Sequence, residues 1–117
     1  MRSPFITLLV LVALGVGSFA GAIRKGATME VKPDSIWFKE VAGLTRWQEL
    51  KKSGDTAGLA SYQDKVLSHR EAWQFKNQLT VKVLGYDSAK NQVNVEMKTP
   101  GRYLGSKWLL DANDLVQ

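Results

Sequence analysis

The chain of 117 residues contains no cysteine and only one histidine, His69. Without cysteine, no disulfide can cross-link the fold, and the lipid-modified cysteine of a lipoprotein anchor is excluded. Zinc sites are built mainly from cysteine and histidine, so a zinc site here would need carboxylates for most of its ligands, which is unusual for zinc. We therefore predict neither a metal site nor a cofactor.

Catalytic patterns are also missing from the sequence. A Ser-His-Asp triad would have to use His69, and no serine of the chain lies in a nucleophile-elbow sequence. Among the carboxylates, Glu40, Glu49, Asp111 and Asp114 could serve glycosidic chemistry, but nothing in their spacing selects a pair. The run from Asp111 to Asp114 lacks the glycine and the distal glutamate of a helix-loop-helix calcium loop. The sequence therefore predicts no catalytic residues and a protein that is not an enzyme.

One long apolar run is present, and it lies at the start of the chain. Arg2 precedes the apolar residues 5–16, and the small residues Ala20 and Ala22 follow them. A basic start, an apolar stretch and small side chains one and three residues before a cut are the parts of a secretory signal peptide. We predict a signal peptide over residues 1–22, cleavage after Ala22 and Ile23 as the first mature residue. The remaining domain would then act in the periplasm or outside the cell.

An uncleaved membrane anchor is the alternative interpretation of the same run. Its apolar character continues weakly to Ile23, and a membrane span needs roughly 20 predominantly apolar residues. Arg24 and Lys25 after the run balance Arg2 and the amino terminus before it, so the flanking charges decide little. On this alternative residues 5–23 would tether the domain to the membrane. Both interpretations place the rest of the chain across the membrane.

The chain is mildly basic. Its formal net charge is +5, and removal of Arg2 with the signal peptide would leave +4. Acidic residues alternate with the basic ones along the sequence, which favours a solvated surface over a nucleic-acid track. Such a surface can still attract lipid headgroups or acidic cell-wall polymers. The predicted partner is therefore an envelope protein or an anionic envelope polymer, and not a nucleic acid.

Residues 23–117 are predicted to form a single α+β domain. Apolar side chains recur at three- and four-residue spacing over about 39–52 and 56–72, which predicts a helical hairpin turning at Ser53-Gly54. Asp55 is expected to cap the second helix. Residues 35–38 form a short apolar stretch that fits either an extended loop or a short strand.

Strands are predicted on both sides of this hairpin. Side chains alternate with period two from Gly26 to Lys32, and again from Leu79 to Met97 around the polar turn 87–91. Because five polar residues are too few for a parallel crossover, the second region predicts an antiparallel hairpin. A last strand is expected over 103–110, followed by one helical turn at 111–115.

The ending from Leu79 to Leu115 resembles the SH3-like small barrel, particularly its bacterial extracytoplasmic versions. The run from Gly105 to Leu115 carries the resemblance, with a glycine, an aromatic and aliphatic strand, one helical turn and a closing apolar residue. The resemblance implies a small antiparallel barrel whose first strand is 26–31 and whose long first loop holds the inserted helices, about 39–72. A generic α+β domain is the alternative.

The peptide-binding residues of SH3 domains do not carry over to this chain. Val93-Asn94-Val95 stands where their tryptophan is expected, and Asp111 and Asp114 lie near the places of their proline and tyrosine. Proline-motif binding is therefore not implied.

Loops beside the strands carry recognition in this architecture, so Trp37, Arg102 and Tyr103 are predicted to bind a ligand. The predicted function is that of an exported binding module for a cell-envelope component or protein partner. A small secreted hydrolase or an inhibitor-type effector is the alternative, and it would require a deep polar cleft.

Overall fold

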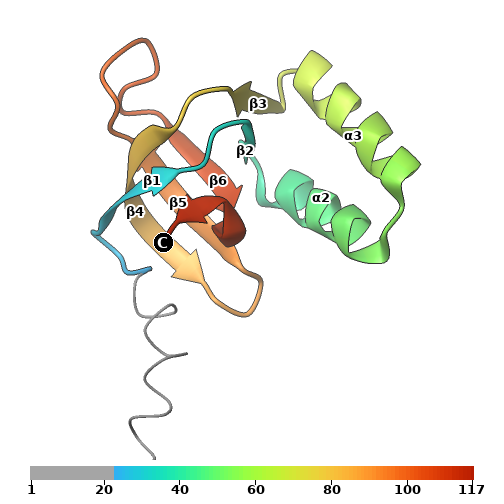
Figure 1. Ribbon diagram of the computed structural model, residues 1–117, viewed down its shortest axis with the longest axis horizontal. Coiled ribbons are helices and arrows are strands. Elements are labelled where there is room, and N and C mark those ends of the chain that lie inside the picture. The colour runs from blue at the N-terminus through green and yellow to red at the C-terminus, as the bar shows by residue number, and fades with distance from the viewer. Residues whose placement is uncertain (1–22) are drawn as a thin grey trace, which may run out of the picture.

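The computed structural model describes residues 23–117, which form an α+β fold with one antiparallel sheet and two helices (Figure 1). The predicted signal peptide and its cleavage residues Ala20 and Ala22 lie outside the described residues. The sheet has the strand order β3-β2-β6-β5-β4-β1-β7. In chain order the elements are β1 (Thr28–Val31), β2 (Ser35–Phe38), α2 (Val41–Ser53), α3 (Thr56–Ser68), β3 (Ala72–Phe75), β4 (Leu79–Asp87), β5 (Gln92–Met97), β6 (Lys107–Asp111), the 3-10 helix η1 (Ala112–Asp114) and β7 (Leu115–Val116).

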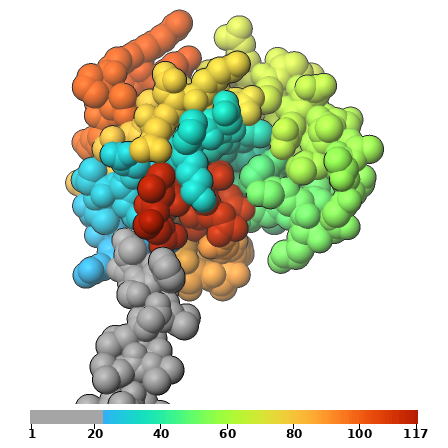
Figure 2. Space-filling model, viewed as in Figure 1, coloured from blue at the N-terminus to red at the C-terminus, as the bar shows by residue number. Residues whose placement is uncertain are grey.

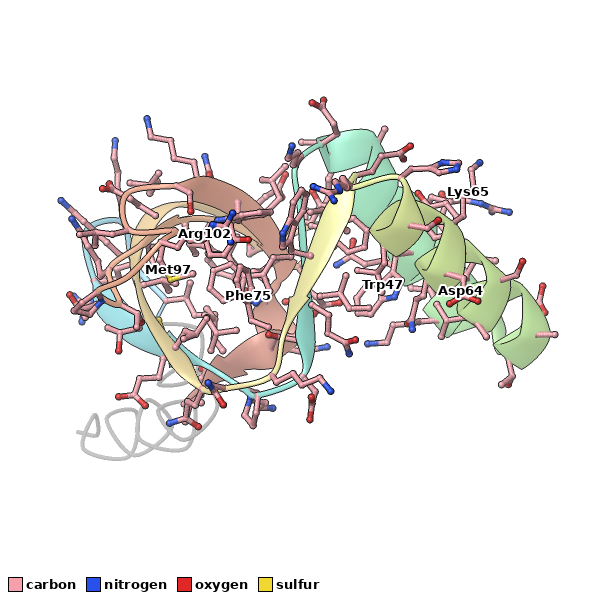
Figure 3. The ribbon with its side chains drawn as sticks, turned by 90° about the horizontal axis from the view of Figure 1, so that it is seen from above. Trp47, Asp64, Lys65, Phe75, Met97 and Arg102 are labelled. Atoms are coloured by element: carbon pink, nitrogen blue, oxygen red, sulfur yellow. The ribbon has the colours of Figure 1, made fainter. Side chains whose placement is uncertain are left out.

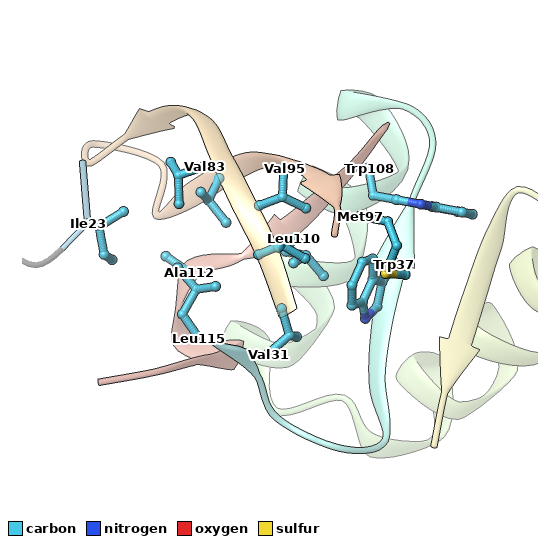
Figure 4. Close-up of a cluster of buried hydrophobic side chains, with 12 residues drawn as sticks. Ile23, Val31, Trp37, Val83, Val95, Met97, Trp108, Leu110, Ala112 and Leu115 are labelled. Atoms are coloured by element: carbon cyan, nitrogen blue, oxygen red, sulfur yellow. The ribbon is translucent and has the colours of Figure 1, made fainter. Parts of the chain in front are cut away.

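One core lies inside the curved part of the sheet, where alternate residues of neighbouring strands meet. Val83 of β4 and Val95 of β5 are opposite each other in register and both are fully buried. A register shift between Val83 and Gly85 bends β4, as a bulge does. Figure 4 shows how these valines lie with the other members of this first core: Ile23, Val31, Trp37, Val81, Val93, Met97, Trp108, Leu110, Ala112 and Leu115.

Strand β2 is buried on both faces, because it separates this first core from a second one. Its residues Ile36 and Phe38 point into the second core, whereas Trp37 points into the first. The second core also contains Leu44, Trp47, Val66 and Ala72, so it holds the helical hairpin against the sheet. Figure 3 shows the hairpin on one side of β2 and β3 and the remaining strands on the other. Residues 35–38 are therefore a strand, which the sequence had left open.

The helical hairpin turns where the sequence predicted. Gly54 follows α2 in the left-handed conformation, with φ 77°, which glycine adopts at low cost. The carboxylate of Asp55 then accepts a hydrogen bond from the backbone N–H of Gly58 at 2.9 Å and caps α3. Both assignments are confirmed.

The second helix ends earlier than predicted. It stops at Ser68, Arg70 takes a positive φ of 58°, and residues 72–75 become strand β3. Trp73, which fits the apolar stripe of a longer helix, instead pairs with Trp37 in the sheet and lies 5.5 Å from the ring of Trp108. The prediction of a helix to residue 72 is therefore wrong, because pairing with β2 outweighs the local helical pattern.

The segment before β6 is also shorter as a strand than predicted. The hairpin of β4 and β5 is confirmed, but residues 101–104 form a turn in which Leu104 N–H donates to the Gly101 carbonyl at 3.2 Å. Gly101 and Gly105 take φ values of 141° and 87°, which interrupt an extended strand. Strand β6 therefore begins at Lys107 and not at Tyr103. Within residues 23–117 neither helix has the length and apolarity needed to cross a bilayer.

Candidate binding groove beside helix α2

The three side chains predicted to bind a ligand do not share one surface. Trp37 is fully buried, its indole N–H donates to Ser35 Oγ at 2.8 Å, and its ring centroid lies 4.8 Å from that of Phe75. A side chain with no exposed surface cannot contact a ligand from solvent. Trp37 therefore does not line a ligand face, because β2 carries it into the first core instead of leaving it beside a loop.

Arg102 and Tyr103 remain accessible and line a small apolar hollow of about 160 Å³. The guanidinium carbon of Arg102 lies 5.9 Å from the centroid of the Tyr103 ring, and that ring packs edge-on against Phe75 at 5.3 Å. Figure 3 shows Arg102 near Phe75 and Met97, on the side of the sheet away from the helices. A ligand role for Arg102 and Tyr103 stays a prediction.

A larger hollow, of about 530 Å³, lies between α2, the turn joining β4 to β5, and η1. We call it the α2 groove. Figure 2 shows its surroundings: the C-terminal segment in red lies against α2 in green, with the β4–β5 turn in orange below. The groove is lined by Thr45, Gln48, Glu49, Lys51, Lys52, Ala89, Lys90, Asn91, Gln92, Asp111 and Asn113.

The floor of the α2 groove is polar although it is buried. Gln92 is 6% exposed, and its side-chain amide donates to Thr45 Oγ1 and to Gln48 Oε1, both at 2.9 Å. Gln48 in turn donates to the carboxylate of Asp111 at 3.1 Å. Buried polar groups are costly unless they are paired, and this chain of bonds pairs them. It also ties α2 to β5 and β6.

Asp111 is the centre of this network. The residue is 5% exposed, and its carboxylate accepts from the Asn91 side chain at 3.2 Å and from the Asn113 backbone N–H at 2.8 Å, besides Gln48. Asn91 has a positive φ of 54°, a conformation that asparagine tolerates better than most residues. Its backbone carbonyl accepts from Gln48 at 3.1 Å. The β4–β5 turn is therefore fixed to both α2 and η1.

The rim of the α2 groove is basic. Lys51, Lys52 and Lys90 are exposed around it, and Glu49 is the only exposed carboxylate among the lining residues. The ammonium nitrogen of Lys51 lies 4.2 Å from the ring centroid of Trp47, a cation–π distance that holds this charge at the helix surface. The three rim lysines outnumber the two lining carboxylates, Glu49 and Asp111, so the lining carries a formal net charge of +1.

Asp114 lies beside the groove and is poorly solvated. Its Oδ2 atom is buried and has no hydrogen-bond partner among the described residues. Burial raises the pKa of Asp114 from 3.8 to about 6, the negative charge of Asp111 adds to the rise, and Lys51 and Lys32 oppose it. At neutral pH Asp114 is therefore mainly ionised, but its negative charge is less well stabilised in the folded protein than in the unfolded chain.

The raised pKa of Asp114 predicts a pH-dependent stability. The folded state binds this proton more tightly than the unfolded state, so its contribution is complete below about pH 4 and is lost as the pH rises through about 6. Asp114→Asn should therefore raise the melting temperature at about pH 7.5 and leave it little changed at about pH 3.5. The exposed Asp64→Asn is the control. Equal effects of Asp114→Asn at both pH values would contradict this account.

Side chains able to hold a metal ion do not gather in the described part of the chain. Among residues 23–117 no three histidine, aspartate or glutamate side chains are arranged to hold a metal ion. His69 is exposed, with Nδ1 3.8 Å from a carboxylate oxygen of Glu71. No family model, curated protein or solved structure matches this chain. Its function is therefore inferred from the geometry of the groove.

The residues that form the groove floor were not singled out from the sequence. The patterns around Asp111 predict neither a catalytic pair, a calcium loop nor a peptide-binding residue, and the amides Gln48, Asn91 and Gln92 belong to no recognisable motif. One feature of the sequence could have indicated the groove. Thr45, Gln48 and Lys52 recur at helical spacing, on a face of α2 next to the buried stripe of Leu44, Trp47 and Leu50. What they face depends on how the hairpin packs against the sheet.

Proposed function

We propose that this chain is an exported, non-enzymatic binding module with an SH3-like barrel, and that it binds an anionic envelope partner in the α2 groove. The order of the elements supports the barrel. β1, β4, β5, β6, η1 and β7 follow one another as the resemblance implies, and β1 pairs with both β4 and the closing strand β7. The helical hairpin lies between β1 and β4, in the place of the long first loop.

Ile23 supports the proposed start of the mature domain. This residue, the first after the predicted cleavage site, is 6% exposed and belongs to the first core. If the signal is cleaved after Ala22, the protein recovered from the extracytoplasmic fraction will have the mass of residues 23–117. A full-length mass in the membrane fraction would instead favour the anchor over residues 5–23.

The binding proposal rests on one observation. The rim of the α2 groove is basic, and the polar groups of its floor are already hydrogen-bonded to one another. Lys51, Lys52 and Lys90 surround a hollow in which the buried carboxylate is satisfied by protein donors. A carboxylate or phosphate that enters can accept from these ammonium groups, and charge-assisted hydrogen bonds are the strong ones. Because the network fixes the floor in advance, little ordering is needed on binding.

Removing the charge of the rim tests this proposal. The variant Lys51→Ala/Lys52→Ala/Lys90→Ala should bind a polyglutamate peptide at least about tenfold more weakly than the original protein, a loss of about 1.4 kcal/mol. Binding should also weaken as salt is added, since exposed charges are screened. Affinity is measured by isothermal titration calorimetry on the protein purified after expression of the full chain.

A second triple variant serves as the matched control. Lys65→Ala/Lys76→Ala/Lys82→Ala removes the same charge from exposed positions outside the groove. It should retain the affinity of the original protein within about twofold. An equal loss in the two triple variants would show attraction by net charge alone and would refute the groove as the site.

A further inference from the structure

A second hollow, of about 330 Å³, adjoins the α2 groove. Lys90 and Gln92 line both hollows, and we call the two adjoining hollows together the depression. The second hollow lies between the first residue of α2 and the outer face of the sheet. Its lining residues are Val41, Gly85, Tyr86, Asp87, Lys90, Gln92, Val93, Asn94 and Leu109.

One face of α2 forms a wall along the whole depression. Val41 lines the second hollow, Thr45 and Gln48 line the first, and Lys52 stands at its far end. These residues follow at spacings of four, three and four, which places their side chains on one side of a helix. At 1.5 Å per residue they span roughly 17 Å. An extended polypeptide of about five residues covers that length.

The chemistry of the wall changes from one end to the other. At the first end Val41 is 47% exposed, which is high for a large aliphatic side chain, and Tyr86 and Leu109 are half-buried beside it. Amide side chains line the middle, and Lys51 and Lys52 occupy the other end. The depression therefore offers an apolar contact and a cationic contact at a separation that one short segment can bridge.

We infer that the ligand is an extended acidic peptide, with an aliphatic or aromatic side chain on Val41, Tyr86 and Leu109 and acidic side chains about four residues away against Lys51 and Lys52. This inference rests on the proposed function and narrows its anionic partner to a protein segment. An anionic polysaccharide has the charge but no aliphatic side chain for the first end. A lipid surface is flat, whereas the depression is recessed between a helix and a turn.

Asn94 suits a peptide backbone, because its side chain carries both a donor and an acceptor for the N–H and C=O groups of an extended chain. The amides of Gln48, Asn91 and Gln92 are already hydrogen-bonded within the network and shape the floor. Asn94 is exposed in the second hollow, one strand position along the same face from the buried Gln92. Side-chain pockets at two ends with polar contacts between them are the usual arrangement for recognising a linear segment.

The test uses fluorescence polarisation with labelled synthetic peptides and the protein purified after expression of the full chain. The first peptide has one leucine, three neutral residues and two aspartates, and a second has the reverse order. Two control peptides are used. In one the leucine is replaced by serine, and in the other the two aspartates directly follow the leucine. We expect one of the first two peptides to bind about tenfold more tightly than both controls, because only that peptide places a leucine at the apolar end and the aspartates at the lysines at the same time.

Val41→Ser should remove the preference for leucine and leave the weaker binding of the serine peptide unchanged. Its matched control is Leu104→Ser, at an aliphatic residue that is 57% exposed on a loop outside the depression. This control should change the affinity for neither the leucine peptide nor the serine peptide. Equal affinity for the leucine and serine peptides would overturn the inference of a peptide with an apolar contact at Val41. That result would not contradict the proposed binding of an anionic partner. If polyglutamate and all four peptides fail to bind, the proposed function itself is refuted.

Discussion

Replacing Trp37 by alanine is expected to lower the free energy of unfolding by roughly 3–5 kcal/mol. The side chain is fully buried and lies 4.8 Å from the ring of Phe75 and 6.1 Å from that of Trp108, so its removal leaves a cavity among the aromatic rings of the first core. Domains of this size are stable by only about 5–15 kcal/mol, so the loss is a large part of the total. Urea denaturation followed by circular dichroism measures it.

Two variants separate this packing role from a role in binding. Trp37→Phe keeps a ring in the core and should cost less than Trp37→Ala, whereas the exposed Leu104→Ala should leave the midpoint nearly unchanged. An unchanged urea midpoint for Trp37→Ala together with lost ligand binding would contradict the buried placement. That result would support the ligand-binding role of Trp37 that the sequence predicted.

Replacing Asp111 by alanine is expected to have the second largest effect, a loss of roughly 2–4 kcal/mol in the free energy of unfolding. The change removes the acceptor used by Gln48, by the Asn91 side chain and by the Asn113 backbone N–H. Each buried donor left without a partner costs about 1–3 kcal/mol, although relaxation and entering water recover part of this. Thermal denaturation of the two proteins at neutral pH gives the difference.

Asp87 provides the control for Asp111, because it makes the same kind of bond at the surface. Its carboxylate accepts from the backbone N–H of Lys90 at 3.2 Å and is exposed. Asp87→Ala should cost no more than about 1 kcal/mol, since water replaces a lost partner at an exposed site. Equal costs at the two positions would show that the groove floor is not a buried network.

Much of the fold follows from local patterns in the sequence. Period-two alternation located β1, β4 and β5, and helical spacing located α2 and most of α3. The turn between the helices was predictable because Gly54 and Asp55 act through their own backbone and side chain, without help from distant residues. Elements whose stability is local were therefore assigned correctly.

The errors occur where distant partners decide the structure. Trp73 fits a helical stripe, but it belongs to β3 because β2 offers it a strand to pair with. Trp37 was predicted to bind a ligand because its stretch fits a loop as well as a strand, yet β2 is enclosed by two cores. Sequence periodicity reports one buried face, so a strand buried on both faces is easily taken for a loop.

The site was harder to predict than the fold, because its residues come from three separate segments of the chain. Gln48 lies on α2, Asn91 in a turn, Gln92 at the start of β5 and Asp111 at the end of β6. None of these types marks a site alone, and the contacts between them exist only after the hairpin packs against the sheet. The adjacent lysines Lys51 and Lys52 indicate a basic surface, but the sequence does not show where in the fold this surface lies.

The central claim is that the α2 groove binds the ligand, and an NMR titration tests it most directly. Backbone amide shifts would be followed as the leucine–aspartate peptide is added to isotope-labelled protein. We expect saturable changes at residues 41–52, 89–92 and 111–113, with little change near Arg102 and Tyr103. Changes centred on Arg102 and Tyr103, with a silent α2 groove, would contradict the account and place recognition on the loop before β6.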